Sequence, residues 1–277
     1  MSLPRIERLF ARRRAAGTTA LVPYLMAGDP DLDTSLRLMH AAVDAGADLI
    51  ELGMPFADPM ADGPVIQLAC ERALAAGTGV LDVLALVRRF RQQDDSTPLI
   101  LMGYLNPIER FGYARFAAAA AEAGVDGVLV VDVPPEEGGE LHAALRGQQL
   151  ATIYLVAPTT APARMAQIAQ AASGFVYYVS LKGVTGAASL DTAAVAERVG
   201  QLRAHSALPV AVGFGVRDAK AAAEVARVAD AVVVGSALVA TVAEHAADVQ
   251  AAETALRARL GELRAAIDRC DADKEFA

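Results

Sequence analysis

Glu51 is a carboxylate inside an apolar stretch, residues 49–53, that has the composition of a buried strand. Burial strips a carboxylate of water and raises its pKa. A carboxyl group that titrates near neutrality suits general acid–base catalysis. A glutamate paired with a lysine inside the protein would produce the same pattern. The spacing alone therefore leaves a catalytic and a structural interpretation of Glu51 open.

The segment that follows Glu51 carries two more carboxylates. Asp58 and Asp62 lie in a loop rich in proline and glycine. Capping of a helix that opens near Pro64 is the default interpretation of Asp62, although the loop could also bring a second carboxylate near Glu51. Asp132, which follows another apolar run, is a further acidic candidate that could equally be a cap.

Glycines mark the ends of three later apolar runs, in segments 180–186, 213–215 and 235–236. Glycine lets backbone N–H groups approach an anion, and a helix that begins at Ser236 would add a favourable partial charge. Each segment alone resembles a common tight turn. Together they predict that the ligand carries a phosphate.

Other catalytic patterns are missing from the sequence. The histidines show no metal-ligand spacing, which predicts no metal site, and we interpret them as packing or surface residues. Lys182 lies in a glycine loop and is interpreted as solvated. Cys70 and Cys270 form no recognisable disulfide or zinc pattern and are interpreted as buried hydrophobes. The histidines are His40, His142, His205 and His245.

Short Val/Ile/Leu runs alternate with Ala-rich amphipathic stretches along the chain, a pattern that is typical of buried parallel strands joined by helices. The strand runs are residues 19–26, 48–53, 98–104, 127–132, 151–157, 175–180, 208–213 and 231–235. The helical stretches are about 32–45, 64–76, 80–93, 113–123, 136–147, 161–172, 190–204, 217–228 and 236–268. The last stretch is long or broken in two, and its apolar stripe of Leu256, Leu260, Leu263 and Ile267 must dock on another element.

Eight such units predict an α/β fold, a (β/α)8 TIM barrel with an extended second βα connection, formed by residues 1–277 as a single domain. The helix-to-strand junctions at 44–50, 122–129 and 227–234 resemble one another, which supports a repeated unit. The N-terminal stretch would form an extra helix that covers the bottom of the barrel through Leu3, Ile6, Leu9 and Phe10. A doubly wound sheet is the alternative, but the first turn lacks its G-x-G-x-x-G pattern.

Composition narrows the function further. The 277 residues are 54% hydrophobic and 21% charged, with a formal net charge of −8, which argues against nucleic acid and anionic membranes as partners. No apolar run approaches the roughly 20 residues of a membrane helix. The basic N-terminus lacks the apolar core of a secretory signal, which predicts a cytoplasmic location.

Taken together, the motif at 49–64, the segment 180–186 and the glycine ends at 213–215 and 235–236 resemble the α subunit of tryptophan synthase. Segments 21–30 and 102–107 are similar to the same family, and the likeness extends from about residue 5 to 268. The resemblance implies a carbon–carbon lyase of L-tryptophan biosynthesis. Its reaction is the retro-aldol cleavage of indole-3-glycerol phosphate to indole and glyceraldehyde 3-phosphate.

The resemblance also implies roles for individual residues. Glu51 would be the acid–base glutamate, and Asp62 would hold the indole N–H and balance charge on the ring. The implied substrate contacts are Tyr24, Tyr177, Thr185 and Phe214, and the implied phosphate-binding residues are Gly186, Gly215, Gly235 and Ser236. Tyr24 departs from a family position that is often Phe, and Leu181-Lys182 replaces an Arg-containing pair.

The family works as an α2β2 complex, so the resemblance implies a β subunit that carries pyridoxal phosphate, while no cofactor is implied in this chain. The loop 56–63 and the segment around Asn106-Pro107 would face that partner. Three alternatives remain open at this point: a stand-alone indole-releasing lyase, a sugar-phosphate isomerase or epimerase, and a partner-activating scaffold without chemistry. Intact Glu51 and Asp62 weigh against the scaffold.

Overall fold

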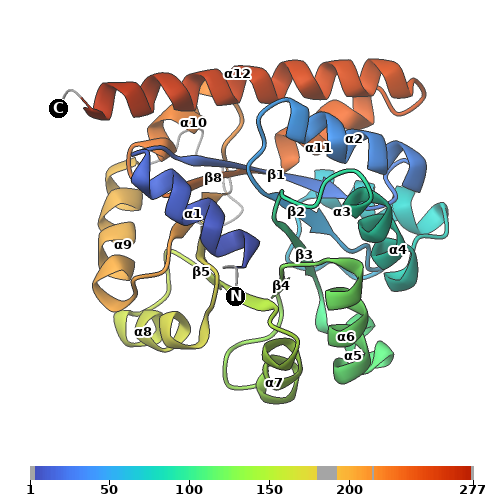
Figure 1. Cartoon of the computed structure of the whole chain (residues 1–277), viewed down its shortest axis with the longest axis horizontal. Coiled ribbons are helices and arrows are strands. Elements are labelled where there is room, and N and C mark those ends of the chain that lie inside the picture. The colour runs from blue at the N-terminus through green and yellow to red at the C-terminus, as the bar shows by residue number, and fades with distance from the viewer. Residues whose placement is uncertain (1–3, 180–191, 214, 276–277) are drawn as a thin grey trace.

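The computed structural model describes residues 4–179, 192–213 and 215–275, and these form a closed barrel of parallel strands in sequence order (Figure 1). Strand β1 pairs with both β2 and β8, which closes the sheet on itself. The predicted TIM barrel is therefore confirmed. The strands are β1 (Ala20–Met26), β2 (Ile50–Gly53), β3 (Leu99–Gly103), β4 (Gly127–Val130), β5 (Ala151–Val156), β6 (Val176–Val179), β7 (Val210–Gly213) and β8 (Ala231–Val234).

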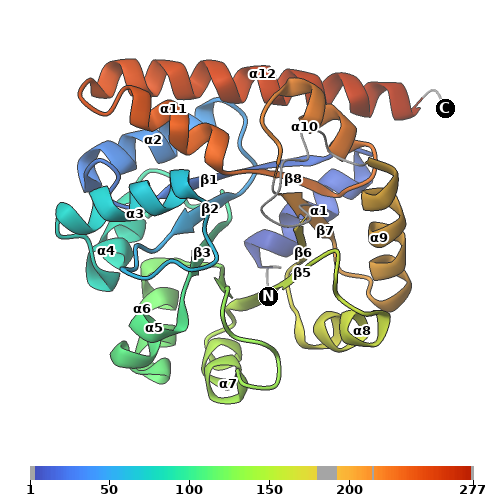
Figure 2. The ribbon, with the colours of Figure 1, turned by 180° about the vertical axis from the view of Figure 1, so that it is seen from behind.

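Helices surround the barrel, as Figures 1 and 2 show. They are α1 (Arg5–Ala15), α2 (Leu32–Asp44), α3 (Pro64–Ala75), α4 (Val80–Arg91), α5 (Leu105–Phe111), α6 (Tyr113–Ala123), α7 (Gly139–Gly147), α8 (Pro162–Ala171), α9 (Thr192–His205), α10 (Ala219–Ala226), α11 (Ser236–Glu244) and α12 (Val249–Glu275). Both α3 and α4 lie between β2 and β3, which confirms the extended second connection. The predicted stretch 236–268 is two helices, broken between Glu244 and Val249.

Helix α5 was not predicted, because seven residues that include Pro107 show no helical periodicity. Asp132 explains part of its position, since Asp132 Oδ1 accepts a hydrogen bond of 2.9 Å from the Leu105 N–H at the first turn of α5. Its carboxylate thus satisfies a backbone donor that a helix leaves without an intrahelical partner. Asp132 does not cap the helix that follows it, since α7 has Gly138 as its N-cap and no side-chain cap; its carboxylate instead accepts from the start of α5 on the neighbouring βα unit.

The barrel interior is filled by inward-facing strand residues and closed at one end by α1. Ile6, Leu9 and Phe10 of α1 are buried and belong to the same apolar cluster as the interior residues. The Phe10 ring lies 5.7 Å from that of Phe175, between centroids. The prediction that the N-terminal helix covers the barrel bottom is confirmed for these three residues, while Leu3 lies outside the described residues.

The repeated helix-to-strand junctions have a common physical basis at this end of the barrel. Each contains an aspartate just before a strand, and its Oδ2 accepts the N–H of a residue near the start of the neighbouring strand. Asp48 accepts a 2.9 Å hydrogen bond from the N–H of Leu21 in β1, and Asp126 accepts one of 2.8 Å from the N–H of Leu99 in β3. Asp230 likewise accepts a 2.8 Å hydrogen bond from the N–H of Val210 in β7.

Helix α12 lies across α2, α10 and α11 on the outside of the barrel (Figure 2). Its stripe of Leu256, Leu260, Leu263 and Ile267 is fully buried there, as the spacing requires. Cys70 and Cys270 are both buried and unbridged, which matches their interpretation as small hydrophobes. No helix in the described part of the chain is long and apolar enough to cross a membrane.

Candidate active site

Strand β2 directs Glu51 into the barrel. Its neighbours Ile50 and Leu52 belong to the apolar layer between sheet and helices, whereas Leu49 belongs to the interior cluster. Because side chains alternate along a strand, Glu51 shares the interior face with Leu49. The side chain is 1% exposed. The position that sequence periodicity predicts for Glu51 is confirmed.

Glu51 is ionisable, buried and poorly compensated. Its Oε1 atom has no hydrogen-bond partner among the described residues. Burial, with a smaller contribution from the charge of Asp62, raises the pKa of Glu51 to about 8. The described lysines pair elsewhere, Lys274 with Asp271 and Lys220 with Glu224. The lysine-paired interpretation thus finds no support in the described part of the chain, and the carboxyl keeps a proton near neutral pH.

Two tyrosines share the interior with Glu51. Tyr24 of β1 is its register partner across the β1–β2 pair, and Tyr177 lies on β6. The pKa of Tyr177 is raised well above its usual value, mainly by burial and to a smaller extent by the charge of Glu51. Burial is also the main cause that raises the pKa of Tyr24 well above its usual value. Both phenols therefore stay protonated and can donate hydrogen bonds into the pocket.

Glycines make room for both hydroxyl groups. A Cβ built on Gly53 would lie 2.1 Å from the Tyr24 hydroxyl oxygen, and one on Gly213 would lie 2.2 Å from that of Tyr177. Both separations are too short for non-bonded atoms. Gly213, which the sequence associates with phosphate binding, thus serves to admit the Tyr177 side chain.

Asp62 approaches the same region from the loop after β2. Helix α3 begins with Gly63 at its N-cap and has no side-chain cap, so the capping interpretation of Asp62 is wrong. Instead, Asp62 Oδ2 accepts a 2.8 Å hydrogen bond from the hydroxyl of Tyr104. Burial raises the pKa of half-buried Asp62, and the Tyr104 hydrogen bond opposes that shift. The charge of Asp62 is the second cause of the raised pKa of Glu51, so the two carboxylates interact electrostatically.

Tyr104 is a site residue that sequence reasoning did not identify. It follows β3 directly and contacts the loop in three ways. Its hydroxyl donates to Asp62 and accepts a 3.0 Å hydrogen bond from the Ala61 N–H, and its ring lies 5.4 Å from that of Phe56. The available signal was its place at the carboxyl end of a barrel strand, where functional side chains gather.

The phosphate-binding candidates lie at the ends of β7 and β8, which are adjacent strands. Gly235 is the N-cap of α11, and the first residue of that helix, Ser236, is exposed. Gly215 has a φ of +81°, a conformation that favours glycine. The structure therefore places a helix N-terminus beside a glycine turn. Thr185, Gly186 and Phe214 lie outside the described residues, as do Ser180 and Lys182.

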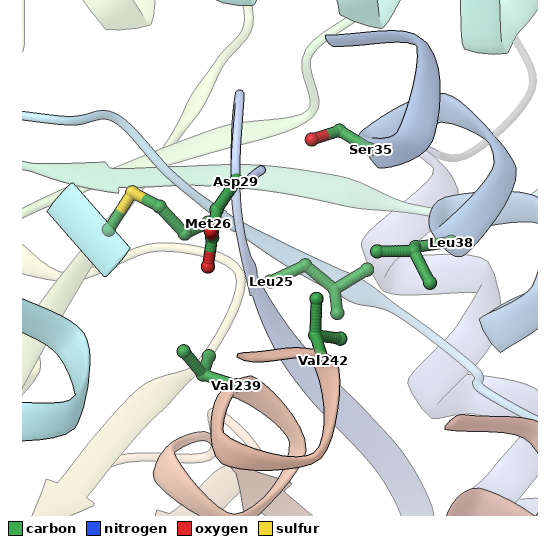
Figure 3. Close-up of a pocket in the computed structure, with 7 residues that line it drawn as sticks. All are labelled: Leu25, Met26, Asp29, Ser35, Leu38, Val239 and Val242. Atoms are coloured by element: carbon green, nitrogen blue, oxygen red, sulfur yellow. The ribbon is translucent and has the colours of Figure 1, made fainter. Parts of the chain in front are cut away.

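A small cavity between β1, α2 and α11 is distinct from this site (Figure 3). Its volume is about 10 Å³, close to the space that one water needs and too small for a substrate. Asp29, the carboxylate in its lining, is already paired with Arg72 through two hydrogen bonds of 2.7 and 2.8 Å. This cavity therefore offers neither the volume nor an available carboxylate for the chemistry.

A closed (β/α)8 barrel with a buried, protonated glutamate, a second carboxylate and a helix N-terminus at the carboxyl ends of its strands defines an enzyme of the TIM-barrel class. Within the described ranges, no cluster of His, Cys, Asp or Glu could hold a metal ion.

Comparison with known proteins identifies the family. The family model for the tryptophan synthase alpha chain matches residues 10–268. A tryptophan synthase alpha chain from Thioalkalivibrio sulfidiphilus is 59% identical over 266 residues, covering 96% of this chain and all of the relative. The crystal structure of tryptophan synthase subunit alpha from Legionella pneumophila superposes with a TM-score of 0.90 at 45% identity, covering 97% of this chain and 100% of that one. A Mycobacterium tuberculosis tryptophan synthase structure gives 0.87 at 41% identity, with 96% and 99% covered.

The chain belongs to the tryptophan synthase alpha chain family, lyases that cleave indole-3-glycerol phosphate to indole and glyceraldehyde 3-phosphate. The identification from sequence motifs is confirmed. Membership in this family also excludes the alternative that the chain is a sugar-phosphate isomerase or epimerase.

Proposed function

We propose that this chain performs the retro-aldol cleavage through Glu51 as the acid–base residue. The observation that carries the proposal is the burial of Glu51 inside the barrel with a pKa of about 8. A group with that pKa is protonated at neutral pH yet exchanges its proton readily, and general acid–base catalysis is most efficient in that range.

The reaction needs two proton movements. The indole ring carbon that leaves must gain a proton, and the hydroxyl on the adjacent glyceryl carbon must lose one. When the carbon–carbon bond breaks, that carbon becomes the aldehyde of glyceraldehyde 3-phosphate and the ring is released as indole. Protonated Glu51 supplies the first proton. The resulting carboxylate, in a pocket that disfavours its charge, is then a suitable base for the second.

Asp62 would accept a hydrogen bond from the indole N–H and balance the positive charge that develops on the ring. The support is its carboxylate, held at 2.8 Å by Tyr104 on the same side of the barrel as Glu51. An anion fixed where charge develops stabilises the transition state more than the ground state. Tyr24 and Tyr177 would line the ring pocket beside it.

The substrate phosphate would bind across the ends of β7 and β8. Backbone N–H groups near Gly235 and Ser236 at the start of α11, together with Gly215, provide donors and a helix dipole. Gly186, Thr185 and Phe214 remain predictions from the resemblance. The proposed steps use side chains alone and assign no cofactor to this chain.

We further propose that the chain works in the cytoplasm in an α2β2 complex, with pyridoxal phosphate in the β subunit. The loop that carries Asp62 presents Met60, which is 78% exposed, and α3 presents Leu68, which is 53% exposed. Large apolar side chains in water are typical of surfaces that a partner covers. This surface and the neighbouring Asn106-Pro107 would face the β subunit.

An assay of purified chain with indole-3-glycerol phosphate, with and without a β subunit, tests the proposal. We expect indole release that increases when the β subunit is added. Full turnover by the lone chain, unchanged by a β subunit, would support a stand-alone lyase instead. No release under either condition would contradict the proposed chemistry.

A further inference from the structure

The Tyr24 side chain extends from the start of α11 to strand β2. At its base, a Cβ built on Gly235, the N-cap of α11, would lie 3.6 Å from the Cβ of Tyr24, an ordinary contact distance. At its tip, a Cβ built on Gly53 would lie 2.1 Å from the hydroxyl oxygen and 2.7 Å from Cζ. The ring therefore connects the proposed phosphate end of the site with the strand that carries Glu51.

The hydroxyl of Tyr24 occupies space on the interior face of β2. Gly53 lies two residues beyond Glu51 on that strand, so the two positions share the interior face. Tyr24 is itself the register partner of Glu51 across the β1–β2 pair. Helix α1 closes the opposite end of the barrel, so a substrate enters at the carboxyl ends of the strands. The hydroxyl therefore lies between Glu51 and the entrance.

Apolar neighbours hold the ring of Tyr24 in this position. Tyr24 is buried and belongs to a small apolar cluster that joins β1 to α3 and α11. The other buried members of the cluster are Met26, Ile66, Ala69, Cys70, Ala73 and Val239. Because side chains in such clusters are closely packed, the ring has little freedom to turn its hydroxyl toward another part of the protein.

The Tyr24 hydroxyl makes no hydrogen bond with any residue that the structure describes. The pKa of Tyr24 is raised by burial first and then, among other charges, by those of Asp62 and Glu51, so the phenol stays protonated beside both carboxylates. The carboxylate of Asp62 is already held by Tyr104 at 2.8 Å. Tyr24 thus offers a donor and an acceptor where the two carboxylates are proposed to meet the substrate ring.

We propose that the Tyr24 hydroxyl selects substrates by their ring substituents, and that this chain takes ring-hydroxylated indole-3-glycerol phosphates in preference to ring-methylated ones. Hydroxyl and methyl groups are similar in size, but only a hydroxyl can form a hydrogen bond with Tyr24. A methyl group would displace water from the phenol and leave it unpaired in a closed pocket, which is unfavourable. Sites that hydrogen-bond a substrate hydroxyl reject analogues without it strongly. The inference rests on the proposed function for the location of the ring.

The test is calorimetric titration with indole-3-propyl phosphates. These analogues lack the glyceryl hydroxyl groups and cannot be cleaved, so their binding is measured whether or not the chain is an active lyase. Each of the ring positions 4 to 7 carries either a hydroxyl or a methyl group. For at least one position, we expect the hydroxyl analogue to bind the natural chain at least tenfold more tightly than its methyl counterpart. Tyr24→Phe should reduce that preference to within twofold.

Tyr154→Phe is the matched control, since it also removes a phenol hydroxyl from a buried tyrosine, but one that contacts His142 of α7. This variant should keep the preference of the natural chain. The unsubstituted analogue should bind Tyr24→Phe within a few-fold of the natural chain, which shows that the pocket is intact.

Four results would each overturn the proposal. They are no binding of any analogue, no preference at any ring position in the natural chain, a preference that persists in Tyr24→Phe, and an equal loss in Tyr154→Phe. Failure of the proposed lyase function would be seen separately. Indole release from indole-3-glycerol phosphate would then be absent, while the binding preference and its dependence on Tyr24 remained.

Discussion

The hydroxyl of Tyr104 donates a 2.8 Å hydrogen bond to Asp62 Oδ2 and accepts one of 3.0 Å from the Ala61 N–H, which ties the loop after β2 to the end of β3. The bond favours the ionised form of Asp62 and orients it. Both effects matter if Asp62 holds the indole N–H. Tyr104 therefore acts through Asp62 as a positioning residue.

Replacing Tyr104 by Phe should lower kcat for indole release by roughly tenfold or more, because a hydrogen bond to a charged group contributes about 1.5–3 kcal/mol. Loss of the bond should also raise the pKa of Asp62, which would move the acid limb of the rate profile to higher pH. Steady-state kinetics across pH would show both effects. Tyr154→Phe is the control, since the Tyr154 hydroxyl contacts His142 of α7 and its loss should leave kcat unchanged. A Tyr104→Phe variant with normal kcat would refute the positioning role.

Glu51→Gln should abolish measurable indole release while leaving substrate affinity within a few-fold. Gln fills the same space but cannot exchange a proton, and general acid–base groups contribute about 100- to 10,000-fold. Single-turnover assays would give the rate, and calorimetry with glyceraldehyde 3-phosphate would report binding. Retained turnover would rule out the assigned role.

Asp62→Asn should also be severely impaired in the rate of indole release, since it loses the charge beside the ring.

Glu51 should also make stability depend on pH. Its pKa is about 8 in the folded protein, against an ordinary value of 4.5, so the folded state holds the proton more tightly. Above pH 4.5 the unfolded chain releases that proton, and the free energy of unfolding falls until about pH 8, where the folded state releases it as well. The full span is roughly 5 kcal/mol.

Denaturant titrations of the natural chain and of Glu51→Gln would measure this contribution. The variant lacks the carboxyl, so the difference in free energy of unfolding should grow in its favour between pH 4.5 and 8. Below pH 4.5 the difference should be constant. A difference that does not change with pH would mean that Glu51 titrates normally in the folded protein.

Gly213→Ala should reduce both stability and activity. Its methyl group would lie 2.2 Å from the Tyr177 hydroxyl oxygen, so the ring must move within the pocket. Overpacking of this kind costs about 1–3 kcal/mol. Thermal unfolding and indole-release assays would detect the two losses. Gly200→Ala in α9 is the matched control, because a Cβ there meets nothing within 4 Å and alanine favours the helix. Equal behaviour of the two variants would contradict the steric argument.

Ser236→Asp should raise KM by tenfold or more, since it places a negative charge at the N-terminus of α11 beside the proposed phosphate position. The fold should persist, because an acidic residue in the first turn interacts favourably with the helix dipole. Ser236→Ala separates charge from loss of the hydroxyl and should have a smaller effect. An unchanged KM in the Asp variant would show that the N-terminus of α11 does not bind the substrate phosphate.

Each of the eight apolar runs is a strand in the structure, with ends within about two residues of those predicted. The runs could be read from sequence because strands buried on both faces need continuous apolar residues. Helix α5 could not, since a short helix held by Asp132 depends on a contact across the β3–β4 pair rather than on its own periodicity. Thr185, Gly186 and Phe214 remain predictions, as does the single domain.

The amino-acid sequence by itself determined the strand order, the inward direction of Glu51 and the membership in the family, because these depend on local alternation and on contiguous motifs. The tertiary structure decided what Asp62 and Gly213 do. Their partners come from other βα units, Tyr104 from the end of β3 and Tyr177 from β6, and are brought near by barrel closure and strand register. A loop aspartate has the same local pattern whether it caps a helix or meets a tyrosine, so only the packed barrel could distinguish the two.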